Sequence, residues 1–288
     1  MLTLSKALLL FIVLSIVKAF ACSPHYQVIE KSNHQIHLLE FDPASCKVVS
    51  VRANQDSTLK SEVSTLVSLH HAIAGINGGF FHLDNNGVAT PAGALKINNE
   101  WLGLMHIPRA AIGWGDHNQK ALVDRIVTKG QKSQKVEVKP LLDASSTSKK
   151  TWQGFPFIVG GTPLLLKNGT AMTNHRSEKT NRSFIEERHA RTAFCIKDPH
   201  HWLFIVSAHT KAPYRQYTDH IVEGLTIEEL TKFLQAQGCK DAINLDGGGS
   251  STLVFEGKVR NTPAGDMDDI FQLFHERPVS DAILLLPH

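Results

Sequence analysis

The sequence predicts a single compact α+β domain with a mixed, largely antiparallel β-sheet core and a few packed helices. Short apolar runs that alternate with polar residues recur along the 288-residue chain, as in half-buried strands. Several of these runs are joined by tight turns, one of them at Glu256–Gly257. Only two segments have the spacing of an amphipathic helix, and no repeat or composition break divides the chain.

Residues 1–21 are predicted to be a secretory signal peptide. Lys6 precedes the apolar run "ALLLFIVLSIV", and Ala19 and Ala21 form an A-x-A cleavage signal. The run is too short for a stable membrane span, and no later run approaches that length. A lipoprotein signal ending at Cys22 is the alternative, but ordinary cleavage fits better. Residues 22–288 are therefore predicted to be one soluble domain, periplasmic or secreted.

Four cysteines allow up to two disulfides in an exported protein, with three pairings open. No two of them form a C-x-x-C motif, so a zinc–thiolate site is not predicted. The chain is long enough to build a core without them, and disulfides would only support the fold. The cysteines are Cys22, Cys46, Cys195 and Cys239.

The charge of the chain does not predict a nucleic-acid partner. The formal net charge is +3, without the clustered basic and aromatic residues of a nucleic-acid surface. The 16 histidines are scattered, and a pair such as His70–His71 points in opposite directions on a regular element. The "GDMDD" segment, with Asp266, Asp268 and Asp269, lacks EF-hand spacing and is expected to be a solvated loop. A divalent cation such as calcium stays open.

The first half of the chain is predicted to contain mainly strands and one helix. "YQVIEKSNHQIHLLEFDP" has the alternation of half-buried strands. "AAIGW", "DRIVTKG" and "KVEVKPLL" are typical of further short strands and turns, and "DASSTSKKT" of an exposed loop. "STLKSEVSTLVSLHHA" is expected to be an amphipathic helix, with one face formed by Leu59, Val63, Leu66, Val67 and His70.

The second half has the clearest helix signal. Thr226 and Glu229 form a capping box, an apolar face follows, and Gly238 ends the helix. "RTAFCI" and "WLFIVSAHT" are predicted strands joined at Asp198–Pro199. "DAINLD" is a predicted buried strand, and "STLVFEGKVRN" a hairpin.

Three consecutive glycines, Gly247, Gly248 and Gly249, follow the strand "DAINLD". Such a run costs backbone entropy, and it lets the backbone approach another molecule closely. A dinucleotide site or a P-loop needs a helix after the glycines, whereas β-forming residues follow here. The G-x-S-x-G spacing is also missing, so neither Ser250 nor Ser251 is a strong hydrolase nucleophile.

Polar residues at the ends of apolar runs are the candidates for chemistry. Asp246 is either a partly desolvated nucleophile or base, or a carboxylate that caps the glycine turn. Arg191 and Arg277 either bind a phosphate or form structural ion pairs. Glu276 is either an acid/base or the partner of the neighbouring arginine. Asn77 either bonds a substrate or belongs to a turn.

Seven motifs together resemble the phosphodiester glycosidase family: "INGGFF", "TPAG", "IVGGTPLLLKNG", "RHARTAF", "GLTIEEL", "INLDGGGSSTLV" and "ERPVSDAI". They extend from about residue 74 to 284. The resemblance implies hydrolysis of a sugar-1-phosphodiester at its glycosidic bond, which releases a free GlcNAc-like sugar and a phosphomonoester. Matched by motif, the polar positions of the family fall on Asn77, Arg191, Asp246, Ser250, Glu276 and Arg277. From this match we expect catalysis at Asp246, with Glu276 as the reserve carboxylate. We expect substrate or phosphate binding at Asn77, Gly78, Arg191, Thr192, Gly247, Gly248, Gly249, Ser250 and Arg277.

Hydrolysis of a sugar-1-phosphodiester would explain why the motifs contain arginines, a glycine loop and an aspartate. A phosphomonoester, with a second pKa of about 6, leaves far more readily than an alkoxide. The site then needs charge neutralisation and one carboxylate, and no cofactor. We expect the glycine loop and Arg191, with Arg277, to hold the phosphate, Asp246 to act at the anomeric carbon, and Asn77 to orient the sugar.

Two other functions stay open. One is a metal-assisted phosphodiesterase that breaks the P–O bond, with Asp246, Glu276 and His209 around a divalent ion. The other is a non-catalytic module that binds carbohydrate or phosphate. It is favoured by the segment "SAHT", with Ala208 and His209, where family members commonly have Asp-Gly-Arg.

Overall fold

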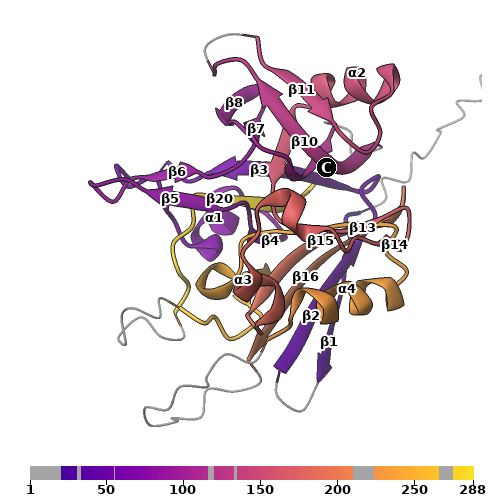
Figure 1. Cartoon of the computed structure of the whole chain (residues 1–288). Coiled ribbons are helices and arrows are strands. Elements are labelled where there is room, and N and C mark those ends of the chain that lie inside the picture. Colours follow the sequence, from indigo (N-terminus) through magenta and orange to yellow (C-terminus); the bar gives the residue numbers. More distant parts are fainter. Residues whose placement is uncertain are drawn as a thin grey trace, which may run out of the picture.

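Antiparallel strands are the main regular elements of the structure, a computed structural model (Figure 1). It describes residues 21–30, 34–54, 56–115, 120–132, 135–209, 224–265 and 275–288. The predicted signal peptide before residue 21 and the "GDMDD" aspartates lie outside the described residues. No helix in the described ranges is long and apolar enough to cross a membrane.

In the described residues the strands form three main sheets and one hairpin, and neighbouring strands are antiparallel. In order across the seven-stranded sheet lie β1 (His25–Glu30), β2 (His34–Phe41), β16 (His201–His209), β15 (Arg191–Asp198), β17 (Asp241–Asn244), β13 (Leu164–Lys167) and β14 (Thr170–Ala171). The six-stranded sheet contains β11 (Glu137–Pro140), β10 (Ala121–Lys129), β9 (Arg109–Trp114), β12 (Phe157–Gly160), β7 (Leu95–Ile97) and β8 (Glu100–Gly103). The five-stranded sheet contains β19 (Lys258–Val259), β18 (Leu253–Phe255), β4 (Ala74–Asn77), β20 (Asp281–Pro287) and β3 (Cys46–Arg52). The hairpin pairs β5 (Phe81–Leu83) with β6 (Ala89–Pro91).

One apolar core joins the three sheets. Phe204 of the first sheet, Trp114 of the second and Ile283 of the third are all buried in it. The indole of Trp114 also donates to the carbonyl of Val48 at 2.9 Å, which links the second sheet to the third. The predicted single α+β domain, with a largely antiparallel core, is confirmed.

A helix covers the outer face of each main sheet. These helices are α1 (Val63–Leu69) on the five-stranded sheet, α2 (Ser146–Gly154) on the six-stranded sheet and α4 (Ile227–Ala236) on the seven-stranded sheet. Each presents apolar side chains to a second core layer, for example Leu66, Trp152 and Leu230. The remaining helical segments are short: α3 (Arg182–Glu186) and the 3₁₀ turns η1 (His175–Glu178) and η2 (Gly248–Ser250).

Two elements with strong local signals agree with the sequence prediction. In α4, Glu229 N donates to Thr226 Oγ1 at 3.1 Å and Thr226 N donates to Glu229 Oε2 at 3.0 Å, which completes the capping box. The β18–β19 hairpin turns at Glu256 and Gly257, whose φ angles are 52° and 69°. Positive φ at both positions is what a tight two-residue turn requires.

The prediction that "DASSTSKKT" is a loop is wrong, because residues from Ser146 onward form α2. Ser145 caps this helix by accepting a hydrogen bond from Ser148 N at 3.1 Å, and Trp152 anchors it in the core. The first predicted helix is also shorter than expected. Leu59 has a φ of 53° and lies before α1, while His70 is its C-cap.

Two disulfides connect distant parts of the fold. Cys22 pairs with Cys46 at the start of β3, and Cys195 of β15 pairs with Cys239 just beyond α4. This selects one of the three pairings that the sequence left open, and every cysteine is used. The second disulfide ties α4 to the sheet that carries Arg191 and Thr192.

Candidate active site

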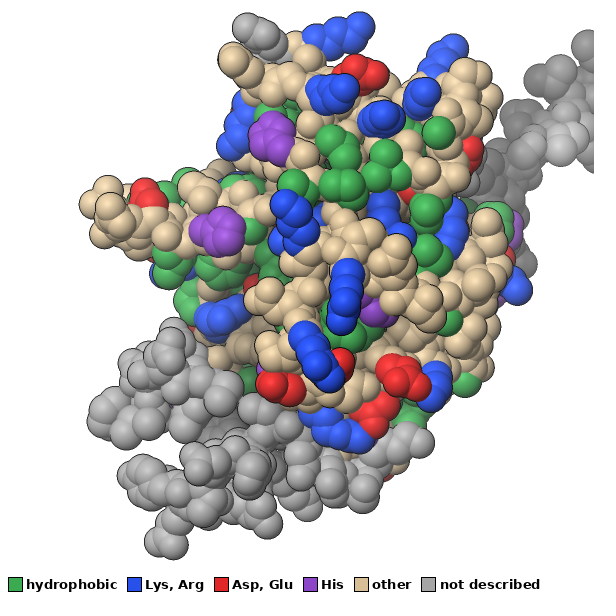
Figure 2. Space-filling model, viewed as in Figure 1, with side chains coloured by type: hydrophobic (Ala, Val, Ile, Leu, Met, Phe, Trp, Pro, Cys, Tyr) green, Lys and Arg blue, Asp and Glu red, His purple; other side chains and the backbone are tan. Residues whose placement is uncertain are grey.

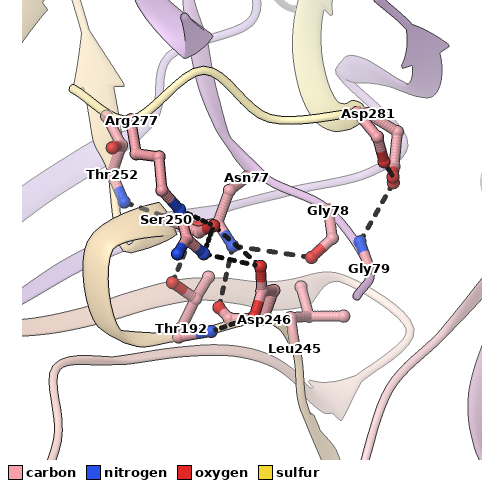
Figure 3. A network of polar contacts seen from close by, with 12 residues as sticks. Asn77, Gly78, Gly79, Thr192, Leu245, Asp246, Ser250, Thr252, Arg277 and Asp281 are labelled. Atoms are coloured by element: carbon pink, nitrogen blue, oxygen red, sulfur yellow. Dashed lines mark hydrogen bonds and ion pairs between the residues drawn. The ribbon is translucent and has the colours of Figure 1, made fainter. Parts of the chain in front are cut away.

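The ends of four strands meet around Asp246 (Figure 3). Asn77 ends β4, Thr192 lies at the start of β15, Asp246 follows β17, and Asp281 begins β20. Antiparallel pairing places Asn77 opposite Ala282, and hydrogen bonds join the other ends. The five-stranded and seven-stranded sheets therefore both contribute to the site.

Asp246 is a buried carboxylate that forms an ion pair with a partly exposed arginine. Its Oδ1 accepts from Gly247 N at 2.9 Å, and its Oδ2 accepts from Ser250 Oγ at 2.7 Å and from Arg277 Nη2 at 3.2 Å. The side chain of Asp246 is 12% exposed and that of Arg277 is 32% exposed. Burial raises the pKa of Asp246, while Arg277 and the hydrogen bonds oppose this shift.

Arg277 joins Asp246 to Ser250 and to an aromatic ring. Its guanidinium donates to Ser250 Oγ through both Nε and Nη2, and it lies 5.8 Å from the centre of the Phe81 ring. The structure thus brings together three predicted site residues, Asp246, Ser250 and Arg277. Arg277 remains partly exposed, so a phosphate oxygen can reach it from solvent.

Asn77 and Thr192 lie behind Asp246, fully buried. Asn77 Nδ2 donates to the carbonyl of Asp246 at 2.8 Å, and Asn77 Oδ1 accepts from Thr192 Oγ1 at 2.7 Å. Thr252 N also donates to Asn77 Oδ1, at 3.3 Å. These contacts hold the peptide of Asp246 in place, and the predicted contact of Asn77 with a sugar stays a prediction.

Packing against the chain requires glycine at positions 247 and 249, and a positive φ favours it at position 248. A Cβ atom on Gly249 would lie 2.0 Å from the carbonyl oxygen of Gly265, and one on Gly247 would lie 2.8 Å from that of Ala190. Gly248 has a φ of 59°, and its N–H donates to Ala190 O at 2.8 Å. Since the amides of Gly247 and Gly248 both bond to protein groups, their predicted use for phosphate stays a prediction.

Arg191 is completely buried and contacts backbone carbonyls. It donates through Nε to Leu225 O at 2.8 Å, and through Nη2 to Phe184 O and Glu187 O at 2.6 and 3.0 Å. Its guanidinium lies 4.5 Å from the centre of the Phe184 ring, and burial lowers its pKa to about 10. Nη1 has no partner among the described residues. Arg191 therefore fixes α3 to the sheet, and its predicted role in phosphate binding stays a prediction.

Glu276 contacts a different part of the structure from its neighbour Arg277. Its Oε2 accepts from Ser64 N at 3.0 Å, in the first turn of α1. Burial raises the pKa of Glu276, and this backbone contact opposes the shift. In the described part of the chain, Glu276 forms no ion pair with Arg277 or hydrogen bond with Asp246; its catalytic role stays a prediction.

Asp281 and Gly78 form a contact whose role the sequence did not predict. The Oδ2 atom of Asp281 accepts from Gly79 N at 3.0 Å, and its carbonyl accepts from Gly78 N at 2.8 Å. Gly78 O in turn accepts from Asp246 N at 3.2 Å. A Cβ on Gly78 would lie only 1.9 Å from Asp281 Oδ2, so only glycine fits here. Asp281 is 1% exposed; burial raises its pKa, and the nearby charge of Asp246 adds to this shift.

A comparison with known proteins identifies the family of this chain. A model of the family described as phosphodiester glycosidase matches residues 70–286, which include all the site residues described above. The chain belongs to the phosphodiester glycosidase family. No curated protein matches it.

Three solved structures share the fold of this phosphodiester glycosidase. The zebrafish N-acetylglucosamine-1-phosphodiester α-N-acetylglucosaminidase catalytic domain, auto-inhibited by its pro-peptide, is 19% identical with a TM-score of 0.66, over 95% of this chain and 85% of that one. A hypothetical protein from Synechocystis is 16% identical with a TM-score of 0.66; the match covers 93% of this chain but only 62% of that one. A protein from Burkholderia pseudomallei is 16% identical with a TM-score of 0.64, over 90% and 75% of the two chains.

The segment "SAHT", which is expected from the sequence to differ from the family pattern, lies at the end of β16. Ala208 is buried and its backbone pairs with Gln35 of β2, so this position belongs to a regular strand. Thr210 lies outside the described residues. Within those residues, no three His, Cys, Asp or Glu side chains form a group that could hold a metal ion. The metal-assisted alternative is therefore left to experiment.

Proposed function

We propose that this phosphodiester glycosidase hydrolyses the glycosidic bond of a sugar-1-phosphodiester and releases a free sugar and a phosphomonoester. The observation that carries the proposal is the ion pair between Asp246 and the partly exposed Arg277, supported by Ser250. In this pair a buried carboxylate contacts a partly exposed guanidinium, a group that can bind a phosphate. Membership of the family supports the reaction type.

In the proposed reaction, Asp246 acts at the anomeric carbon, either as nucleophile or as base for the attacking water. Arg277 binds the phosphate, because its guanidinium carries a permanent charge and can donate to two oxygens at once. When Arg277 moves part of its interaction from Asp246 to the substrate, the carboxylate loses a partner and becomes more reactive. The Asn77 side chain donates to the carbonyl of Asp246, and Asp281 holds Gly78, whose carbonyl accepts from Asp246 N.

The leaving group explains why one well-placed carboxylate is sufficient. The departing phosphomonoester has a second pKa of about 6, so it leaves without the strong acid that an alkoxide requires. Arg277 neutralises the charge that develops on its oxygens. No cofactor takes part in this proposal.

We further propose that the protein is exported and that the sugar is GlcNAc-like. Two disulfides that use all four cysteines favour an oxidising compartment. The sugar is proposed from the name of the zebrafish relative, an N-acetylglucosamine-1-phosphodiester α-N-acetylglucosaminidase.

The proposal is tested by identifying the products formed from UDP-GlcNAc in isotopically labelled water. Glycosidic cleavage gives free GlcNAc and UDP, with the heavy oxygen on the anomeric carbon. Cleavage of a P–O bond places the label on phosphorus, and it would contradict the proposal. The same assay with and without EDTA tests metal dependence. Binding of the substrate without turnover would instead support a non-catalytic module.

A further inference from the structure

One segment of the sequence has a clear excess of basic over acidic residues. Residues 120–150 contain eight Lys and Arg against three Asp and Glu, a net charge of +5, whereas the rest of the chain has 22 against 24, a net charge of −2. This segment forms β10, β11 and α2. The net charge of the whole chain is only +3, although residues 120–150 alone carry +5.

Seven of these basic residues are exposed lysines on one lobe of the molecule. We call β10, β11, α2 and their connections the lysine-rich lobe. Figure 2 shows Lys and Arg side chains spread over this lobe, at the top of the view, with fewer acidic side chains among them. The lysines are Lys120, Lys129, Lys132, Lys135, Lys139, Lys149 and Lys150.

The charges of these lysines are available to a partner. None of the ion pairs between described residues includes one of the seven. The other charged groups of the lobe are partly neutralised: Arg125 pairs with Glu178 at 2.7 Å, and Asp124 accepts from the backbone of Leu142 at 2.9 Å. Only Glu137 and Asp143 are exposed acids here.

The layout of the lobe fits an extended polyanion. The nine residues of β10 extend over about 30 Å at the rise of a β-strand, with Lys120 just before one end and Lys129 at the other. A span of this size exceeds a small ligand and matches several successive phosphates of a polymer. The Debye length of about 8 Å at physiological salt lets neighbouring lysines reinforce one another.

The surface chemistry of the lobe distinguishes between classes of polyanion. Its only aromatic residue, Trp152, is buried, so bases of a single-stranded nucleic acid have no ring on which to stack. The exposed face of α2 carries Ser146, Thr147 and lysines, without the apolar side chains of a membrane-surface helix. A phosphodiester-linked glycan can bind to such a surface through its phosphates alone, because the exposed lysines supply the positive charge.

We propose that the lysine-rich lobe binds an anionic, phosphodiester-linked glycan and holds this polymer on the enzyme. The choice of glycan rests on the proposed function, because a sugar-1-phosphodiester is a unit of such a polymer. The binding itself is electrostatic and independent of hydrolysis. It weakens as salt increases, because lysines that bind phosphates release counterions.

The test measures binding of the full chain to poly(glycerol phosphate), with neutral dextran as the control polymer. The lobe variant combines Lys132→Gln, Lys135→Gln, Lys139→Gln and Lys150→Gln. The control variant changes four exposed lysines outside the lobe: Lys47→Gln, Lys179→Gln, Lys240→Gln and Lys258→Gln. Both variants lose the same total charge.

We expect the lobe variant to bind poly(glycerol phosphate) about 10–100-fold more weakly than the wild type at low salt, with a shallower salt dependence. The control variant should change affinity by less than about 3-fold, and turnover of UDP-GlcNAc should be the same in all three proteins. Equal weakening in both variants, or tighter binding of duplex DNA with the same number of phosphates, would overturn the proposal. If the polymer binds as expected but no substrate is hydrolysed, the proposed function fails and the lobe assignment stands.

Discussion

Two buried carboxylates in this protein each pair with an arginine, and they differ in what surrounds the pair. Glu178 is fully buried and accepts four hydrogen bonds, from Arg125 Nε, Leu164 N, Ala110 N and Thr162 Oγ1, at 2.7 to 3.2 Å. The side chain of its arginine is 8% exposed. Asp246 accepts from fewer groups, and its arginine is 32% exposed on the side-chain scale.

The comparison separates a carboxylate that stabilises the fold from one that can react. Glu178 links β9, β10 and β13 and has no side open to a ligand. Asp246 accepts three hydrogen bonds from described residues, one fewer than Glu178, and its partner Arg277 is partly exposed to solvent. Stability is expected to depend mainly on the first pair, and activity on the second.

The largest expected effect is on turnover by Asp246→Asn. The amide keeps the size of the carboxylate but cannot act as nucleophile or base, so kcat should fall by about 10⁴-fold. Product release from UDP-GlcNAc and the far-ultraviolet circular dichroism spectrum are the two measurements. A folded variant with near wild-type turnover would remove Asp246 from the mechanism.

Glu178→Ala tests the other half of the comparison. It leaves Arg125 buried without its charge partner, which should lower the free energy of unfolding by about 3–5 kcal/mol. Urea denaturation measures this loss, and turnover per folded molecule should stay close to wild type. Glu186→Ala is the control, because Glu186 pairs with Arg182 on the exposed surface and should cost less than about 1 kcal/mol. Equal losses in the two variants would contradict the comparison.

Arg277→Gln should change the pH dependence of activity. Arg277 lowers the pKa of Asp246 against the effect of burial, so its removal raises this pKa further. Asp246 must be ionised to act, and the acidic limb of the kcat/KM profile should therefore move to higher pH. The maximum should also fall by about 100-fold, since phosphate binding is lost. An unshifted acidic limb would show that Arg277 does not control the ionisation of Asp246.

Asp281 is a third buried carboxylate, and substitutions at this position show whether it supports activity, as Asp246 does, or only stability, as Glu178 does. Asp281→Ala removes the acceptor of Gly79 N–H and should lower kcat by about 10-fold, because Gly78 also positions the peptide of Asp246. Asp281→Asn keeps an acceptor and should recover most of the activity. Asp124→Ala is the matched control, since Asp124 is equally buried and accepts from backbone amides in another sheet. If both alanine variants lose only stability, Asp281 resembles Glu178.

The parts of the fold that local chemistry determines were predictable from the sequence. The capping box of Thr226 and Glu229 and the turn at Glu256–Gly257 act within a few residues, and both are present. Helix α2 was missed because its sequence is rich in Ser, Thr and Lys and its main anchor is a single buried tryptophan, Trp152. Tertiary packing of one side chain outweighs local composition there.

The site was harder to predict because its contacts join residues far apart in sequence. Asp246 and Arg277 were both candidates, but their pairing and the burial of Arg191 depend on how the sheets pack. The bond from Gly79 to Asp281 spans 202 residues, and the bond from Ser64 to Glu276 spans 212. No local pattern in the sequence reports such contacts.

The position of β20 has a consequence for biosynthesis. This strand lies between β3 and β4, so these earlier strands cannot complete their sheet until residues 281–287 have been synthesised. Such non-local pairing makes folding slow, because a long loop must close before its contacts form. The five-stranded sheet therefore cannot be completed before residues 281–287 have been synthesised, and Asp281 cannot bond to Gly78 and Gly79 before that point.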